Sequence, residues 1–113
     1  MATVIVKYKE HIRDWVMANS KDIELQIVNV SAQILRRNPG DILVEITPYG
    51  IVNDSTPDLF LRGETSRVNA HLLDSWARLL IESINPKNTM NIKIAVKTTA
   101  IESCWVCNES TRS

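Results

Sequence analysis

The sequence predicts an α+β fold in which two βαβ units form a four-stranded sheet with two helices on one face. Two amphipathic segments of helical period are each enclosed by short segments in which apolar and polar residues alternate. An Asn-Pro pair follows each helical segment, at Asn38-Pro39 and at Asn85-Pro86, and an alternating strand follows each pair. We therefore interpret the halves as an internal repeat of about fifty residues, joined as two right-handed crossovers.

The length and composition indicate one domain. The chain has 113 residues, and we expect a domain at 1–108 followed by a polar tail at 109–113. Its 13 Lys and Arg residues balance 13 Asp and Glu residues, which argues against the basic surface of a nucleic-acid or membrane-surface binder. The sequence contains neither a long apolar run nor a secretory signal pattern. We expect a cytoplasmic protein with no nucleic-acid partner and no membrane partner.

The first half is expected to begin with a strand at residues 3–8. A helix follows, and its strongest part starts at Ser20 as the N-cap. Apolar residues recur there at helical spacing, at Ile23, Ile27, Val30 and Ile34. Residues 12–17 form either a separate helical turn or the start of the same helix. Arg36 and Arg37 are expected in the last turn, where cations suit the helix dipole.

The other elements follow in the same order. One strand is expected at 41–49 and a short one at 58–62, which Gly63 ends. The second helix is expected at 66–84 and the last strand at 90–100. The apolar stripe of the second helix comprises Val68, Leu72, Trp76, Leu79 or Leu80, and Ile84.

The alternation assigns each strand residue to one of two faces. The face toward the helices is expected to hold Val4, Val6, Ile42, Val44, Ile46, Leu59, Leu61, Ile92, Ile94 and Val96. The other face is expected to hold Ile5, Lys7, Leu43, Glu45, Phe60, Arg62, Lys93, Ala95 and Lys97. This second face mixes apolar and charged residues, so it is either a subunit interface or an ordinary exposed sheet face.

This layout resembles the tautomerase superfamily, in particular members of the size of macrophage migration inhibitory factor. The stretches that carry the resemblance are 3–6, 37–48 (Arg-Asn-Pro-Gly-Asp-Ile-Leu-Val-Glu-Ile-Thr-Pro) and 79–86 (Leu-Leu-Ile-Glu-Ser-Ile-Asn-Pro). The resemblance implies a homotrimer whose sheets face inward, with residues 101–106 pairing across the subunit boundary. It also implies active sites between subunits, around the start of the first strand.

The resemblance further implies a catalytic role for the N-terminal amine. Enzymes of the family begin, once the initiator Met is removed, with a proline that acts as general base or acid, and Ala2 stands in that place here. Without Met1, Ala2 would present a primary amine with an ordinary pKa of about 8. Desolvation would lower that pKa, so that the amine could act as a base or form a Schiff base with a carbonyl substrate. The ring that fixes a proline amine is absent.

The substrates implied by the resemblance are small oxo acids, whose carboxylate needs a cation while charge develops on the enolate oxygen. A basic residue before the second strand often has this role in the family, and Arg36 or Arg37 stands there. Arg62 and Lys97 could serve in the same way. Each of these cations also has an ordinary explanation in helix capping or solubility.

No cofactor or metal is expected. Cys104 and Cys107 form a CxxC pattern near the C-terminus, but a zinc site would need a second pair of ligands. The two histidines, His11 and His71, are not brought together by their spacing. The simpler interpretation is that the cysteines pack at an interface.

Three functions remain open from the sequence. The chain could be an isomerase that interconverts keto and enol forms of an oxo acid, using Ala2 and Arg36 or Arg37. It could be a non-catalytic trimer of the same fold with a binding or structural role. The same order of elements also describes ferredoxin-like domains, which pair their strands differently and often act as dimeric binding modules.

Overall fold

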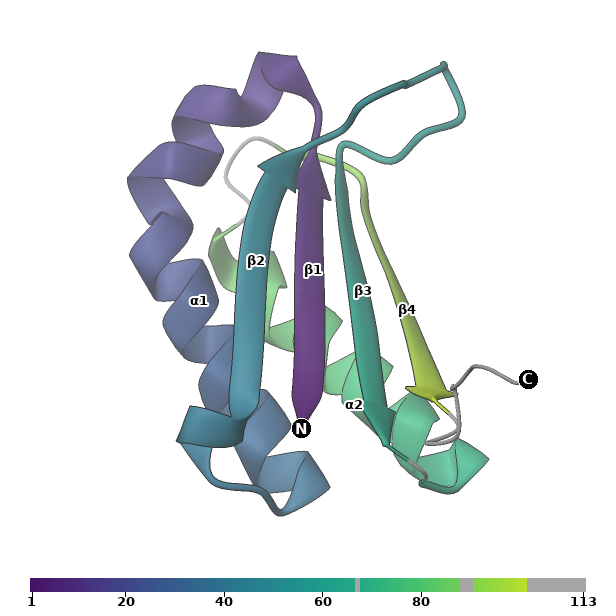
Figure 1. Ribbon diagram of the computed structural model, residues 1–113. Coiled ribbons are helices and arrows are strands. Elements are labelled where there is room, and N and C mark those ends of the chain that lie inside the picture. The colour runs from purple at the N-terminus through teal and green to yellow at the C-terminus, as the bar shows by residue number, and fades with distance from the viewer. Residues whose placement is uncertain (67, 88–90, 102–113) are drawn as a thin grey trace, which may run out of the picture.

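The computed structural model describes residues 1–66, 68–87 and 91–101, which form one sheet and two long helices (Figure 1). The strands are β1 (Ala2–Tyr8), β2 (Ile42–Pro48), β3 (Leu59–Ser66) and β4 (Ile94–Ile101). The helices are α1 (Arg13–Leu35) and α2 (Ala70–Ile84). Short 3₁₀ turns lie at Glu10–Ile12, Pro39–Asp41 and Asn85–Lys87.

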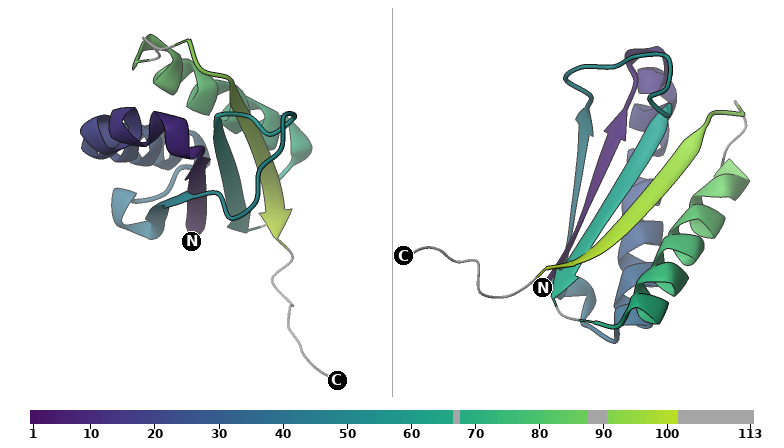
Figure 2. Two further views of the ribbon diagram at one scale, coloured as in Figure 1. Left: turned by 90° about the horizontal axis from the view of Figure 1, so that it is seen from above. Right: turned by 90° about the vertical axis from the view of Figure 1, so that its right-hand side faces the viewer.

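The sheet order β2-β1-β3-β4 confirms the predicted fold class. β1 and β2 are parallel neighbours, as are β3 and β4, while β1 and β3 are antiparallel. Each pair of parallel strands is joined through a helix, and both helices cover the same face of the sheet (Figure 2). A ferredoxin-like domain would separate the two strands of each βαβ unit by another strand. The observed pairing therefore contradicts the ferredoxin-like alternative.

The register confirms the predicted face toward the helices. Val4 lies level with Val44 on one side and Gly63 on the other, so these residues share a face. On that face the two central strands are fully buried, whereas β2 and β4 at the edges are covered only in part. The core is completed from the helices by Ile12, Val16, Ile23, Ile27, Leu35, Trp76, Leu80 and Ile84. Apolar burial of this kind supplies most of the free energy of folding.

Helix α1 starts earlier than the sequence indicated. The interpretation of Ser20 as the N-cap is wrong, because residues 13–17 already belong to the same helix. The 3₁₀ turn that ends at Ile12 leads straight into α1, and no side chain caps this start. Ser20 lies within the helix, where its hydroxyl donates a hydrogen bond to the Met17 carbonyl (3.1 Å).

The predicted end of the third strand and the predicted start of the second helix are both wrong. Gly63 does not end its strand, because β3 continues to Ser66, and Ser66 does not open the helix. Helix α2 begins at Ala70 instead, where the Asn69 side chain accepts a hydrogen bond from the Leu72 amide (2.8 Å) as the N-cap. Gly63 is buried within the strand beneath the side chain of Trp76.

The last strand is shorter than predicted. β4 starts at Ile94, and residue 90, the predicted start, lies outside the described residues. Ile92 precedes the strand yet is still buried in the core. In the stripe of α2, Leu80 is the buried residue and Leu79 is 37% exposed, which settles that alternative.

We expect Gly63→Ala to destabilise the protein. An added Cβ would lie 2.7 Å from Cη2 of Trp76, inside the normal contact distance, and the Trp76 ring is fully buried and has no room to move aside. Overpacking of this kind costs about 1–3 kcal/mol. Urea unfolding monitored by circular dichroism measures the difference. Gly40→Ala and Gly50→Ala are matched controls, because no atom of the described residues lies within 4 Å of their added Cβ. Equal stability of Gly63→Ala and these controls would contradict the packing described.

Candidate functional site

The start of β1 lies at the middle of one end of the sheet. Ala2 is fully buried there, between Ile42 at the start of β2 and Thr65 near the end of β3. Met1 precedes it and is 74% exposed. The start of β1 thus lies between the start of β2 and the end of β3 (Figure 1).

Arg36 and Arg37 lie just beyond α1, so their placement in its last turn is wrong. Arg36 adopts a left-handed conformation (φ 55°, ψ 52°), which few non-glycine residues adopt, and this conformation ends the helix. The Arg37 amide then donates a hydrogen bond to the Ala32 carbonyl (2.9 Å). The turn leaves the Arg36 side chain exposed and directs Arg37 toward the sheet.

Arg37 reaches the end of β3 that lies beside Ala2. Its guanidinium donates a hydrogen bond to the Ser66 hydroxyl, and its Nε is buried with no hydrogen-bond partner among the described residues. The Thr65 hydroxyl is also buried and, within the same part of the chain, unpartnered. Buried polar groups without partners are rare and costly, and they mark places where a ligand, an ion or water completes the bonding. We therefore take Ala2, Arg37, Thr65 and Ser66 as the candidate site.

The structure separates the other two predicted cations from this site. Arg62 lies level with Ile5, three residues along β1 from Ala2, and Lys97 lies beside Arg62 on β4. Both residues project from the sheet face opposite the helices. Arg62 forms an ion pair with Glu64 (Nε to Oε2, 3.7 Å).

The sequence does not predict Thr65 and Ser66 as site residues, because it predicts a strand that ends at Gly63. A signal was present, since Leu59, Leu61, Gly63 and Thr65 continue one alternation of small or apolar residues. Following that period would have brought Thr65 level with the start of β1.

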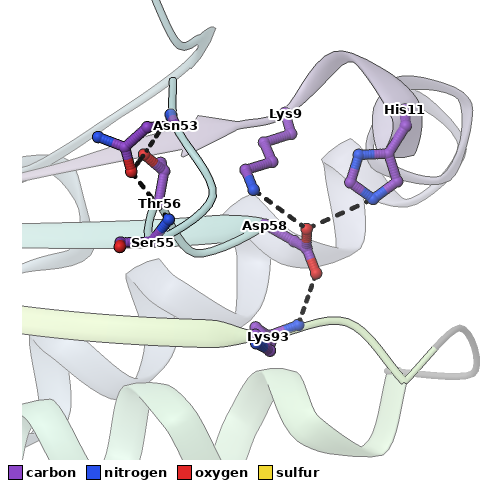
Figure 3. Close-up of polar contacts among 7 residues, drawn as sticks. All are labelled: Lys9, His11, Asn53, Ser55, Thr56, Asp58 and Lys93. Atoms are coloured by element: carbon purple, nitrogen blue, oxygen red, sulfur yellow. Dashed lines mark hydrogen bonds and ion pairs between the residues drawn. The ribbon is translucent and has the colours of Figure 1, made fainter. Parts of the chain in front are cut away.

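The opposite end of the sheet holds a denser polar cluster around Asp58 (Figure 3). Its carboxylate lies 4.0 Å from Lys9 Nζ and 3.4 Å from His11 Nε2, and it accepts a hydrogen bond from the Lys93 amide (2.9 Å). The Asp58 carbonyl also accepts from the Lys9 amide (3.0 Å). These contacts join the end of β1 to the segments before β3 and β4, so the role of Asp58 is to hold these three segments together.

Tyr49, just after β2, is the residue in this region whose pKa is perturbed. Burial raises the pKa of its phenol, and the negative charge of Asp58 raises it further. The hydroxyl is buried without a hydrogen-bond partner in the described structure. The protein therefore holds Tyr49 in its neutral form.

The remaining candidates from the sequence gain no support as sites. The described residues contain no group of three or more His, Cys, Asp or Glu side chains that could hold a metal ion. Cys104, Cys107 and the polar tail at 109–113 lie outside the described residues. His71 is exposed on α2. Among the described residues, no helix combines the length and hydrophobicity needed to cross a bilayer.

Comparison with solved structures finds the same fold in several known proteins. A fused 4-OT described as a wild-type symmetric trimer aligns with a TM-score of 0.70 at 8% identity, over 88% of this chain and 85% of that one. Malonate semialdehyde decarboxylase, solved in wild-type, mutant and inactivated forms, aligns at 0.64 with 10% identity, over 95% and 91%. A macrophage migration inhibitory factor-like protein from Entamoeba histolytica aligns at 0.63 with 8% identity, over 96% of each chain.

These similarities confirm the predicted resemblance at the level of fold. The chain has the fold of the tautomerase superfamily over nearly its whole length. Neither the protein-family models nor the sequences of curated proteins gave a match to it.

Tyr49→Phe tests the environment of Tyr49 through the pH dependence of stability. A phenol with a raised pKa keeps its proton in the folded protein at a pH where the unfolded chain has lost it. Stability therefore falls as the pH rises above about 10, the pKa of an unfolded tyrosine. We expect Tyr49→Phe to lose less stability than the wild type above that pH. Urea unfolding at pH 7 and at about pH 10.5 measures this difference.

The comparison at pH 7 serves as the control for Tyr49→Phe. Because the hydroxyl has no partner in the described structure, its removal should change the free energy of unfolding by less than about 1 kcal/mol. An identical alkaline loss in variant and wild type would show that Tyr49 ionises as freely in the folded protein as in the unfolded chain.

Proposed function

We propose that this protein is a homotrimeric isomerase that interconverts the keto and enol forms of a small oxo acid at the start of β1. The observation that carries the proposal is a pair of buried polar atoms that have no hydrogen-bond partner among the described residues. They are the Thr65 hydroxyl, opposite Ala2, and Nε of Arg37, whose guanidinium donates to the neighbouring Ser66. A cation and a hydroxyl donor at one buried strand end suit a substrate that carries a carboxylate and a carbonyl oxygen.

The proposed reaction moves one proton within the substrate. With Met1 removed, the Ala2 amine would lie at the buried strand end and, in its neutral form, take a proton from the carbon next to the keto group. The electron pair of that C–H bond forms the enol double bond, and the protonated Ala2 amine returns the proton to the carbonyl oxygen, so the product is an isomer. Arg37 would hold the carboxylate, and the Thr65 hydroxyl would donate to the oxygen that gains charge.

Ligand binding without catalysis is the second candidate function. The observation that favours it is Ala2 itself, a residue without the fixed secondary amine of proline, locked by strand pairing on both sides. Arg37 and Thr65 would then bind an oxo acid that the protein leaves unchanged.

We expect Arg37→Met to reduce kcat/KM for phenylpyruvate tautomerisation by roughly a hundredfold, because the variant keeps an unbranched apolar stem and loses the charge that holds the carboxylate. The loss of the enol absorbance measures the rate. Arg78→Met is the matched control, since Arg78 is exposed on α2, away from this end of the sheet. Urea unfolding of both variants separates loss of activity from loss of fold.

The two candidate functions differ when the N-terminal amine is blocked. Acetylation of a chain that begins with Ala2 should abolish tautomerisation if the amine is the base. Phenylpyruvate that binds with no turnover, and binds less to Arg37→Met, would favour the binding function. Equal activity of Arg37→Met and Arg78→Met would contradict both assignments.

The homotrimer is supported by the open face of the sheet, where Leu43 is 55% exposed and Ile5 and Phe60 are half-buried. We expect a mass near three chains by light scattering on a size-exclusion column. Phe60→Asp should reduce that mass toward one chain, because the variant places a charge on the sheet face that the trimer would bury. Leu25→Asp is the control, since Leu25 is 57% exposed on α1 and faces away from the sheet. A trimer that tolerates Phe60→Asp would exclude this face as the interface.

A further inference from the structure

Within the described residues, both edges of the sheet are unpaired. No described strand pairs with the outer edge of β2 or of β4. On the side toward the helices Ile42 is buried, but four other apolar residues of these strands are covered only in part, namely Val44 and Ile46 on β2 and Ile94 and Val96 on β4. Unpaired edges with exposed apolar surface are places where another strand can add to a sheet.

The two edges carry opposite charges. Glu45 is the one charged residue of β2, and Lys97 is the one charged residue of β4. Both side chains are exposed, and neither forms an ion pair with another described residue. Each edge of the sheet therefore presents a single charge with no counterion from the described part of the chain.

The register places these two charges at the same height on the same face. Glu45 lies level with Ile5, Ile5 with Arg62, and Arg62 with Lys97, so the four residues form one row across the sheet. The row runs from a negative charge at the β2 edge, past the apolar Ile5 and the ion-paired Arg62, to a positive charge at the β4 edge. Such a surface matches a second copy of itself when the two edges meet head to tail.

Repulsion between Arg62 and Lys97 at the β4 edge favours a negatively charged group from a partner molecule. Like charges side by side on neighbouring strands destabilise a sheet, and Arg62 and Lys97 are such neighbours. Arg62 is compensated by Glu64 on its own strand, at 3.7 Å. Lys97 has no such compensation in the described structure, and a carboxylate brought to the β4 edge would supply it.

We propose that copies of this chain associate with the β2 edge of one against the β4 edge of the next, and that Glu45 pairs with Lys97 of the partner subunit. This inference rests on the proposed trimer and specifies which sheet edges meet between neighbouring copies. Because the two contacting edges differ, every copy offers one edge and receives the other, and a ring forms if the rotation closes.

Charge reversal tests the pair. Glu45→Lys and Lys97→Glu should each raise the concentration of half-assembly at least tenfold, because each brings like charges together at the contact. The double variant should return this concentration to within about threefold of the wild type. Lys21→Glu and Glu24→Lys, exposed on α1, are the controls and should leave assembly unchanged. Light scattering at low and high salt measures the wild type and all of these variants.

Cross-linking tests the contact directly. Glu45 and Lys97 of one chain are separated by three strand spacings, roughly 14 Å, which is beyond the reach of a disulfide. In a chain with Cys104 and Cys107 replaced by Ser, Glu45→Cys together with Lys97→Cys should therefore form disulfides only between copies. Oxidation should give covalent dimers and trimers on a non-reducing gel.

The outcomes separate this inference from the proposed assembly. Disassembly by each reversal, rescue by the double variant and covalent oligomers would support the pair. If the wild type is a trimer, both charge-reversal variants assemble as well as it does, and the cysteine variant forms no disulfides between copies, the ion pair is wrong. The proposed trimer would still hold in that case. A wild-type monomer at every concentration would overturn the trimer, and the pair with it.

Discussion

The close approach of Trp76 to Gly63 fixes how both helices sit on the sheet. Trp76 is fully buried on α2, its ring lies against Gly63 on β3, and its Nε1 donates a hydrogen bond to the Ser31 hydroxyl on α1 (2.9 Å). One side chain therefore joins both helices to the sheet. Because Gly63 has no Cβ, β3 passes beneath the ring and continues to Thr65, the residue opposite Ala2. The position of the candidate site thus depends on a packing contact made earlier along the same strand.

The periodicity of the sequence was enough to predict the strand faces and the two crossovers, because burial on one face imposes an alternation that can be read locally. It could not predict the role of Gly63, since a glycine in a strand resembles a terminator until the tryptophan that covers it is known. Likewise, the start of α1 has no side-chain cap, so Ser20 offered the nearest recognisable start. Arg37 was placed near Ala2 only through the resemblance, and its contact with Ser66 required the left-handed turn at Arg36.

The two ends of the sheet differ in how far their polar groups are hydrogen-bonded. At one end the Asp58 carboxylate has two side-chain neighbours, Lys9 and His11, and a backbone donor at Lys93. Such a charge is expected where several loops must be held together, and it leaves little capacity for a ligand. At the other end, Arg37 Nε and the Thr65 hydroxyl are buried without partners in the described structure. An unsatisfied buried polar group costs about 1–3 kcal/mol. A ligand that forms these missing hydrogen bonds would therefore gain more binding free energy at the end that contains Ala2 than at the other end.

The candidate site and the sheet edge are also close neighbours. Ile42, the first residue of β2, is the direct partner of Ala2, and β2 is itself an edge strand. A copy docked along this edge would lie about two strand spacings, roughly 10 Å, from β1. It would therefore border the space in front of Ala2 and limit the access of water to that end of the sheet. Low access of water strengthens the electrostatic contacts that a carboxylate makes with Arg37. Assembly and ligand binding are for this reason expected to favour each other, although they depend on different residues.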